Sequence, residues 1–290
     1  MAKPVYAFEE ADSKKRMLLG GKGAGLSEMT RLKLPVPPGF IITTEVCNKY
    51  YDNNKKLPKD LMSAVMKNIT KMEKKTGKKW NSTKNPLLVS VRSGAAISMP
   101  GMMDTILNLG LNEKTVEGFA EQTKNPRFSW DSYRRFIQLF GKVVFGVNDE
   151  KFDHVLDSAK TKQGVSDDSK LNVESLKTIV SEYKKICEAH TKRKFPDSPK
   201  EQLELSIEAV FRSWMGERAI VYREKNNITK DIANGTAVNV VTMVFGNMGD
   251  DSATGVVFTR NGHNGKKEIE GEYLINAQGE DVVAGVRTGK

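Results

Sequence analysis

Apolar side chains recur every three or four residues through the middle of the chain, which predicts amphipathic helices packed against a core. One helix after another is expected from about 116 to 193, and Asn172 is placed to cap one of them. A lysine-rich amphipathic helix is expected earlier in the chain. The apolar positions that define these helices are Leu61, Val65, Ile69 and Met72, then Tyr133, Phe136, Ile137, Phe140, Val143 and Val144, and then Leu176, Ile179, Val180, Tyr183, Ile186, Cys187 and His190.

Short apolar runs with β-branched residues predict strands on both sides of this helical region. They lie at 40–43, 86–91, 236–245, 254–259 and 272–276. The pattern predicts an α+β fold in which a mainly helical insert separates two parts that contain sheet. We expect three units, which are an α/β subdomain with phosphate-binding loops over 1–115, the helical insert over 116–200 and a β-rich subdomain over 201–290.

Glycines surround a lysine at 20–25, where the sequence reads Gly-Gly-Lys-Gly-Ala-Gly. We expect a turn at this segment, followed by a short helix over 26–32. A glycine turn leaves backbone N–H groups bare, and Lys22 can reach an oxyanion from it. The alternative is an ordinary surface lysine in a turn.

Arg92 is a second candidate for binding an anion. It leaves the strand expected at 86–91 and leads into Ser93 and Gly94. A guanidinium group at such a strand end is well placed to meet a phosphate. The alternative is an ion pair with a carboxylate in the core.

Three further segments carry unusual or polar side chains. The loop 98–105 holds three methionines, which more often pack than act chemically. Arg134 and Arg135 adjoin on an expected helix, so helical spacing should turn one of them to solvent. The polar turn 250–255 opens onto a strand. Taken together, these features predict an anion site built from strand-end loops.

Several familiar devices are absent from the sequence. There is no P-loop, no Rossmann glycine fingerprint, no nucleophile elbow and no metal-ligand spacing among the three histidines. His190 lies on an apolar stripe and is expected to pack in the core. Cys47 and Cys187 are expected to be reduced thiols.

The net charge of +10 raises the question of nucleic-acid binding. Between 53 and 84, ten lysines against two acidic residues account for +8 of it. This segment has no arginine and only one aromatic residue, Trp80, so a solvated lysine face is favoured over a surface that reads bases. No apolar run is long enough to span a membrane, and the N-terminus has no signal core. We therefore expect a cytoplasmic protein that binds neither nucleic acid nor membrane.

Five strings of residues, in this order, resemble the opening of the pyruvate phosphate dikinases. Phosphoenolpyruvate synthases and glucan dikinases share the architecture, but we expect them to lack the Pro-Gly-Met-Met-Asp-Thr and Asn-Ala-Gln-Gly-Glu-Asp strings present here. The five strings lie at 20–26 with 34–40, 90–96 with 99–105, 133–138, 243–251 and 274–287.

The resemblance implies an ATP-grasp-like fold and an enzyme that interconverts ATP, phosphate and pyruvate with AMP, pyrophosphate and phosphoenolpyruvate. In that family this region holds ATP with Mg²⁺ and passes the β-phosphoryl group to a histidine on a separate domain, while phosphate takes the γ-phosphoryl group. The matching motifs imply that Lys22 and Arg92 bind the ATP phosphates and that Gly101 belongs to a loop that covers them. They imply that Arg135 neutralises charge on the transferring group and that the N–H groups of Thr254 and Gly255 contact phosphate. They also imply that Met243 to Phe245 contact the adenine.

The rest of the family's machinery is expected beyond Lys290. The resemblance places the acidic Mg²⁺ ligands, the phosphohistidine domain and the pyruvate-binding domain there, and it is compatible with a homodimeric full-length enzyme. We therefore expect residues 1–290 alone to bind nucleotide weakly and not to complete turnover. The alternative function is a stand-alone ATP-binding regulatory module without catalysis.

Overall fold

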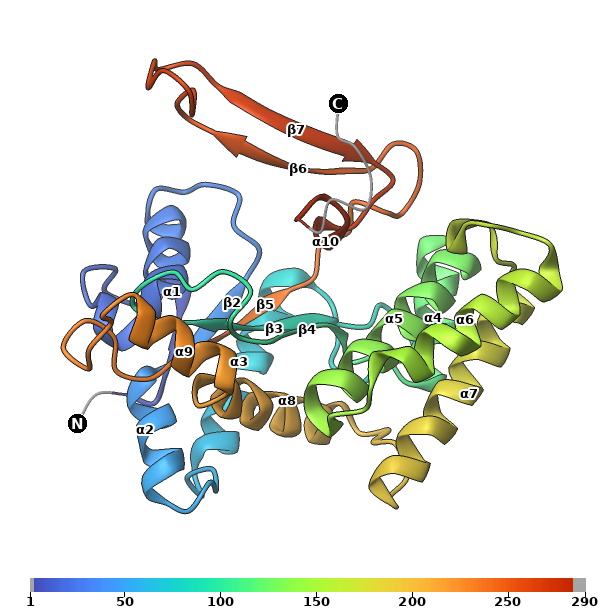
Figure 1. Ribbon diagram of the computed structural model, residues 1–290, viewed down its shortest axis with the longest axis horizontal. Coiled ribbons are helices and arrows are strands. Elements are labelled where there is room, and N and C mark those ends of the chain that lie inside the picture. Colours follow the sequence, from blue (N-terminus) through green and yellow to red (C-terminus); the bar gives the residue numbers. More distant parts are fainter. Residues whose placement is uncertain (1–2, 284–290) are drawn as a thin grey trace.

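The computed structural model describes residues 3–283, which form two antiparallel sheets and a set of helices (Figure 1). The larger sheet has the strand order β1-β2-β5-β3-β4, and the smaller sheet is a hairpin of β6 and β7. The mixture confirms the expected α+β class. The strands are β1 (Val5–Ala7), β2 (Gly39–Ile42), β3 (Val89–Gly94), β4 (Thr105–Leu109), β5 (Ala237–Thr242), β6 (Ala253–Phe258) and β7 (Glu270–Ile275).

Helices cover the larger sheet, and the four helices from α4 to α7 gather at one end of it (Figure 1, green to yellow). They confirm the helical region expected from about 116 to 193. Asn172 caps α7 as expected, because its side chain accepts a hydrogen bond from the Ser175 N–H at 2.8 Å. The helices are η1 (Phe8–Glu10), α1 (Arg16–Arg31), α2 (Thr44–Asp52), α3 (Leu61–Thr76), α4 (Glu113–Thr123), α5 (Pro126–Phe145), α6 (Asp149–Gln163), η2 (Asp168–Lys170), α7 (Val173–Thr191), α8 (Pro199–Trp214), α9 (Glu217–Lys225) and α10 (Gly279–Val283).

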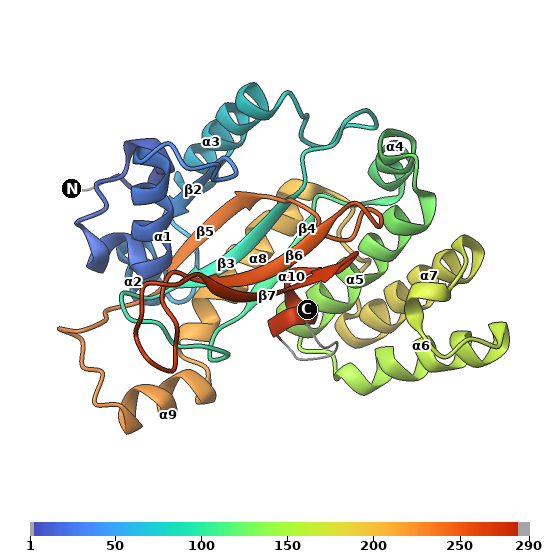
Figure 2. The same ribbon diagram turned by 90° about the horizontal axis from the view of Figure 1, so that it is seen from above.

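Strand β5 comes from the last quarter of the chain, yet it lies at the centre of the larger sheet. It pairs with β2 on one side and with β3 on the other, so that Asn239 lies opposite both Ile41 and Arg92. The segment that follows β5 leads to the hairpin, which lies across the sheet when seen from above (Figure 2). The division into units at 115 and 200 stays a prediction.

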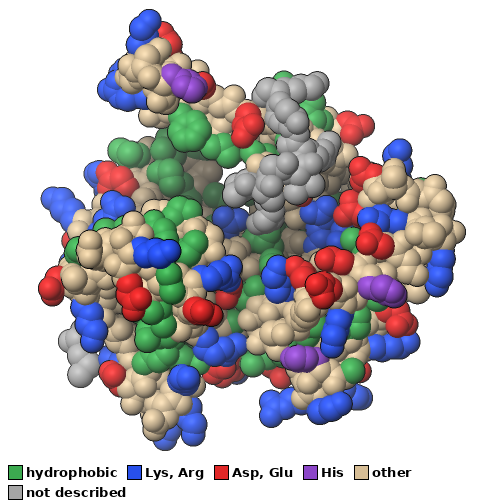
Figure 3. Space-filling view, viewed as in Figure 1, with side chains coloured by type: hydrophobic (Ala, Val, Ile, Leu, Met, Phe, Trp, Pro, Cys, Tyr) green, Lys and Arg blue, Asp and Glu red, His purple; other side chains and the backbone are tan. Residues whose placement is uncertain are grey.

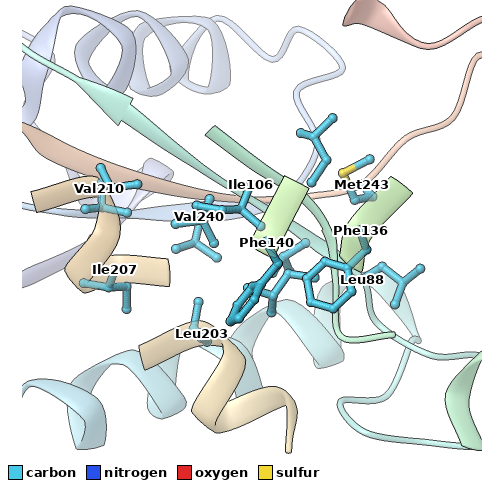
Figure 4. Close-up of a cluster of buried hydrophobic side chains, with 14 of the residues drawn as sticks. Leu88, Ile106, Phe136, Phe140, Leu203, Ile207, Val210, Val240 and Met243 are labelled. Atoms are coloured by element: carbon cyan, nitrogen blue, oxygen red, sulfur yellow. The ribbon is translucent and has the colours of Figure 1, made fainter. Parts of the chain in front are cut away.

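The main core lies between one face of the sheet and the helices beneath it. Figure 4 shows Phe136 and Phe140 of α5 beside Leu88, with Leu203, Ile207 and Val210 of α8 beneath the sheet. Residues on the same face of adjacent strands pair side by side, which gives these helices a continuous apolar surface. Met99 is buried here, and Met102 and Met103 pack against the core, which confirms packing as the role of the loop methionines.

The other face of the sheet carries α1, and here the expectation of a glycine turn at 20–25 is wrong. Gly20, with φ 71° and ψ 160°, interrupts α1 with a kink, and the residues that follow it, 21–25, are helical. A β-carbon at Gly23 would lie 3.0 Å from side-chain atoms of both Ile41 and Asn239. The glycines therefore let the helix press closely on the sheet, which a helix with larger side chains could not do.

The lysine-rich helix α3 has the expected amphipathic pattern, because Leu61, Val65, Ile69 and Met72 are all buried. On its outer surface, Lys71 and Lys75 form ion pairs with Glu10 and Glu9, which offset part of its charge. The solvated lysine face is thus the arrangement that this helix adopts.

His190 and the two cysteines differ in burial. His190 is exposed, so its expected packing in the core is wrong, because the buried part of the apolar stripe on α7 ends at Cys187. Cys47 and Cys187 are buried free thiols. Among the described residues, no helix combines the length and apolar character that crossing a bilayer requires.

Candidate functional site

Two adjoining cavities lie between the larger sheet, helix α5 and the β6–β7 hairpin. Figure 3 shows the molecule hollowed below the hairpin, with basic side chains beside the hollow. The smaller cavity, of about 180 Å³, is lined from β3, β4, the segment after β5, β6 and the start of α10. The larger cavity, of about 850 Å³, is lined mainly from α5 and the loops that face it. Leu107 and Gln278 line both cavities and form part of the wall that the two share.

Lys22 and Arg92 lie close together on the face of the sheet that carries α1. A β-carbon added at Gly94 would be 3.3 Å from the Cβ of Lys22, and Arg92 is two residues earlier on the same side of β3. Arg92 also lines the smaller cavity. Within residues 3–283, neither side chain makes a hydrogen bond or an ion pair, so the alternative of a core carboxylate partner for Arg92 does not hold.

The sequence placed Arg92 at a strand end, and this is wrong. Strand β3 continues to Gly94, so Arg92 lies inside it, paired with Thr105 on one side and Asn239 on the other. The backbone of Arg92 is therefore held by two neighbouring strands, which fixes the direction of its side chain more firmly than a loop would.

The electrostatic surroundings of Lys22 are unusual. Desolvation by the surrounding protein, with a smaller effect of the Arg92 cation, lowers the pKa of Lys22 from 10.5 to about 8. Part of the side chain is nevertheless exposed. The two observations describe an amine that is open to solvent on one side and enclosed by protein and a like charge on the others. An anion placed between Lys22 and Arg92 would relieve the repulsion between them.

The residues expected near the base line the smaller cavity. Met243 is buried, and its N–H donates to the Leu88 carbonyl at 2.9 Å. Phe245 packs against Phe119 and Phe128, with ring centroids 5.4 and 5.1 Å apart. These side chains give the cavity an apolar wall.

Thr254 also lines this cavity, whereas Gly255 is the next residue along β6 and does not. Both were expected where a polar turn opens onto a strand, and they lie at the start of that strand, opposite Leu274 and Tyr273. In the described part of the chain, β6 pairs on one edge only, so alternate N–H groups along its other edge remain available to a ligand.

Arg134 and Arg135 take part in a buried charge network in the wall of the larger cavity. Arg134 is 4% exposed, and its Nε donates to Asp131 Oδ1 at 3.0 Å. Arg135 contacts three carboxylates: Asp131 at 3.1 Å, Asp168 at 3.7 Å and Asp281 of α10 at 3.3 Å. Helical spacing was expected to turn one of the two arginines to solvent, and Arg135 is the more exposed, at 27%, but it faces the larger cavity and is held by these carboxylates.

Asp131 is the centre of this network. Burial on its own would raise the pKa of Asp131, but the guanidinium groups of Arg134 and Arg135 outweigh it and hold the pKa below its usual range. The carboxylate is therefore ionised at neutral pH and fixes both arginines in place. Arg135 consequently points at the larger cavity with its position set by carboxylates on either side.

Gly101 is not brought to either cavity. It is exposed with φ 71°, and its carbonyl accepts a hydrogen bond from Arg218 at 3.3 Å. Arg218 also contacts Asp104 at 3.4 Å, so the loop rests against α9. The proposed role of Gly101 in covering a phosphate would require this loop to move toward the sheet.

Two buried amides at the site escaped the sequence analysis. Asn239 is fully buried between Arg92 and Ile41, and neither atom of its amide has a hydrogen-bond partner among the described residues. Gln278 lines both cavities and is 6% exposed. Asn239 could have been noticed in the sequence, because it is a polar residue inside the apolar run that forms β5. Gln278 belongs to one of the five strings, but nothing in the sequence distinguished it from its neighbours there.

The described residues do not by themselves fit a magnesium site. Among the side chains that the structure describes, no group of three or more histidine, cysteine, aspartate or glutamate residues is arranged as metal ligands. The carboxylates Asp131, Asp168 and Asp281 in the larger cavity all contact arginines. The expected ligands were placed beyond Lys290, and the end of the last recognised string, 284–287, lies outside the described residues.

Lys22 and Arg92, which have no ion-pair partner among the described residues, lie beside the smaller cavity, whose wall is partly apolar. This arrangement fits a ligand with an anionic end and a flat apolar part. Comparison with known proteins agrees with this. The family model described as "Pyruvate phosphate dikinase, AMP/ATP-binding domain" matches residues 16–56 and 53–289.

Individual relatives show the same likeness. The chain is 57% identical over 284 residues to pyruvate, phosphate dikinase of Entamoeba histolytica, covering 98% of this chain and 32% of that protein. The corresponding enzyme of Clostridium symbiosum is 55% identical over 289 residues, covering 99% and 33%. The chloroplastic pyruvate, phosphate dikinase 1 of Arabidopsis thaliana is 50% identical over 290 residues, covering 99% and 30%. The chain thus spans about a third of the length of these relatives, and it belongs to the AMP/ATP-binding domain family of pyruvate phosphate dikinase.

Proposed function

We propose that this chain binds ATP and acts as the phosphoryl-donor region of a pyruvate phosphate dikinase, in which ATP, phosphate and pyruvate are converted to AMP, pyrophosphate and phosphoenolpyruvate through a phosphohistidine on another domain. The observation that carries the proposal is a pair of cations, Lys22 and Arg92, which lie together beside the smaller cavity without an ion-pair partner among the described residues. Family membership supports the nucleotide, and the named relatives support the reaction.

In this proposal the fold is ATP-grasp-like, with the nucleotide held between the larger sheet and the hairpin. Lys22 and Arg92 bind the polyphosphate, and the free edge of β6 at Thr254 and Gly255 offers N–H groups to it. Met243 and Phe245 contact the adenine. Arg135 neutralises charge on the transferring group, and the loop with Gly101 covers the phosphates. Phosphoryl transfer needs mainly positioning and positive charge around spread-out oxyanions, which these residues supply.

Magnesium is expected to accompany ATP, because kinases use it to neutralise the polyphosphate. The residues between 3 and 283 do not form its ligand set, so no step of the transfer is assigned to it here. The remaining proposed partners are phosphate and the phosphohistidine and pyruvate-binding domains of the whole enzyme, which is proposed to be a homodimer.

Replacing Arg92 with alanine is expected to weaken ATP binding by about 10- to 100-fold, because a charge-assisted contact to phosphate contributes about 1.5–3 kcal/mol. Calorimetric titration with ATP and Mg²⁺, carried to millimolar ligand, measures the change. Arg193→Ala removes one positive charge from an exposed loop and is the matched control, with little change expected. Equal ATP affinity in the Arg92→Ala variant and the wild type would remove Arg92 from the site.

The lowered pKa of Lys22 makes a second prediction, about pH. Lys22 carries its charge below about pH 8 and loses it above. A bound polyphosphate favours the charged form, so ATP affinity is expected to fall by about tenfold between pH 7.5 and 9.5. The Lys22→Arg variant keeps its charge throughout this range and should show a nearly flat profile. A wild-type profile as flat as that of Lys22→Arg would show that Lys22 does not contact the anion.

A further inference from the structure

Gln278 occupies the turn between β7 and α10, and its position is fixed by neighbouring polar contacts. Its backbone N–H donates to Asp281 Oδ2 at 2.9 Å. The other carboxylate oxygen of Asp281 accepts a hydrogen bond from Arg135 Nη1 at 3.3 Å. The turn that carries Gln278 is therefore tied to helix α5 across the larger cavity, and the side chain is held in the wall that the two cavities share.

The side-chain amide of Gln278 is buried, and its hydrogen-bonding capacity is not fully used by the described residues. It is 6% exposed, and its Nε2 has no hydrogen-bond partner within the described residues. Burying an amide donor without a partner is unfavourable, and most buried polar groups are paired. Gln202, the other fully enclosed glutamine named here, shows the usual arrangement, since its Nε2 donates to the carbonyls of Leu111 and Pro196 and its Oε1 accepts from Gly110.

A second buried amide at the same cavity has an unused atom. Asn108 is 1% exposed and lies at the irregular register of β4, with φ 57°. Its Nδ2 donates to the Ser132 carbonyl at 3.2 Å, while its Oδ1 has no partner in the part of the chain that is described. Both Asn108 and Gln278 line the larger cavity. Irregular strand positions of this kind are common beside binding sites, where they aim a side chain.

The chemistry of the unused atoms indicates which part of a ligand they meet. Amides are uncharged, so they suit hydroxyls and ring nitrogens better than phosphates. In the larger cavity, Arg134 and Arg135 are already paired with carboxylates, and Arg127 donates to the backbone carbonyls of Leu171 and Asp168. Lys22 and Arg92, which have no ion-pair partner among the described residues, lie near the smaller cavity. We infer that Gln278 is a nucleotide-binding residue whose amide hydrogen-bonds the uncharged nucleoside part of the ligand, the base or the ribose, with Asn108 beside it in the same cavity.

This inference rests on the proposed function. Comparing the binding of two ligands, ATP and inorganic tripolyphosphate, distinguishes a failure of the inference from a failure of the proposed function. ATP carries a nucleoside, and inorganic tripolyphosphate presents similar anionic groups without one. Gln278→Met keeps the length of the side chain and removes its hydrogen bonding. The variant is expected to bind ATP about three- to tenfold more weakly, the loss typical of one hydrogen bond, with tripolyphosphate affinity unchanged. Its melting temperature should be unchanged or higher, because no protein contact of Nε2 is lost.

Gln202→Met is the matched control. It removes hydrogen bonds that exist in the structure, so it should lower the melting temperature and leave the ratio of ATP to tripolyphosphate affinity as in the wild type. The inference is overturned if Gln278→Met leaves ATP affinity intact, or weakens both ligands alike. The inference is also overturned if the wild type and every variant bind tripolyphosphate as tightly as they bind ATP. That result would leave the proposed anion site in place. A wild-type protein that binds neither ligand overturns the proposed function and this inference with it.

Discussion

Gly20→Ala is expected to lower the free energy of unfolding by about 3–5 kcal/mol and to abolish measurable ATP binding. Gly20 has φ 71° and ψ 160°, a combination that is essentially restricted to glycine. A β-carbon there would also lie 1.9 Å from the Gly94 carbonyl oxygen, so α1 and β3 must separate to admit it. Lys22 is two residues away on α1, and it would move with the helix. Urea denaturation measures the stability, and calorimetric titration with ATP measures the binding.

Gly25→Ala is the matched control in the same helix. Gly25 has helical geometry, and a β-carbon at this position meets nothing within 4 Å. Alanine should therefore stabilise the protein by about 0.5–1 kcal/mol through helix propensity and leave ATP binding unchanged. If Gly20→Ala behaved like Gly25→Ala, the close contact between α1 and β3 would not be what positions Lys22.

Asp131→Ala is expected to destabilise the protein by about 3–5 kcal/mol, because it leaves a buried guanidinium without its main counter-charge. Arg134 is 4% exposed and keeps only Asp168 as a carboxylate partner in the variant, at 2.9 Å. Arg135 loses one of its three carboxylates and becomes less firmly oriented toward the larger cavity. Urea denaturation at pH 7 measures the loss. Asp157→Ala, which removes an exposed carboxylate paired with Lys160 on α6, should cost less than about 1 kcal/mol.

The Asp131 contribution should also depend on pH. Its folded-state pKa is lowered, so the carboxylate stabilises the native state at every pH above its unfolded pKa of about 4. That stabilisation is lost as the pH falls through the lower folded value. The difference between wild type and Asp131→Ala should thus be constant from pH 5 to 7 and shrink in stronger acid. A difference that grew toward acid pH would contradict the assignment of Asp131 as an ionised counter-charge.

The network around Asp131 connects stability to the candidate site. It holds Arg135 by carboxylates from α5, from η2 and from α10. Because α10 follows the hairpin, the contact between Arg135 and Asp281 also ties the hairpin's base to the helical part. If the proposed site binds a polyphosphate that draws Arg135 away from Asp281, this tie between α5 and α10 would loosen.

The periodicity of the sequence was enough to identify most of its helices and strands. Stripes such as that of Phe136 and Phe140 define helices locally, because a 3.6-residue repeat buries one face wherever the helix docks. The short β-branched runs likewise marked β2, β3, β5, β6 and β7. The family followed from strings of residues whose order and spacing are specific. These features depend on neighbours along the chain, so they could be inferred without coordinates.

The tertiary structure decided what local patterns leave open. Glycine is compatible with both a turn and a tightly packed helix, and close packing on the nearby sheet accompanies the helical geometry of 21–25. Strand β5 pairs with strands about 150 and 200 residues earlier, which places Asn239 beside Arg92 and puts Arg92 inside a strand. His190 follows the apolar stripe of its helix, yet the buried side chains of that stripe end at Cys187, and His190 is exposed. The orphan amide of Gln278 likewise depends on contacts between distant segments, and such contacts are set by packing and long-range pairing rather than by sequence neighbours.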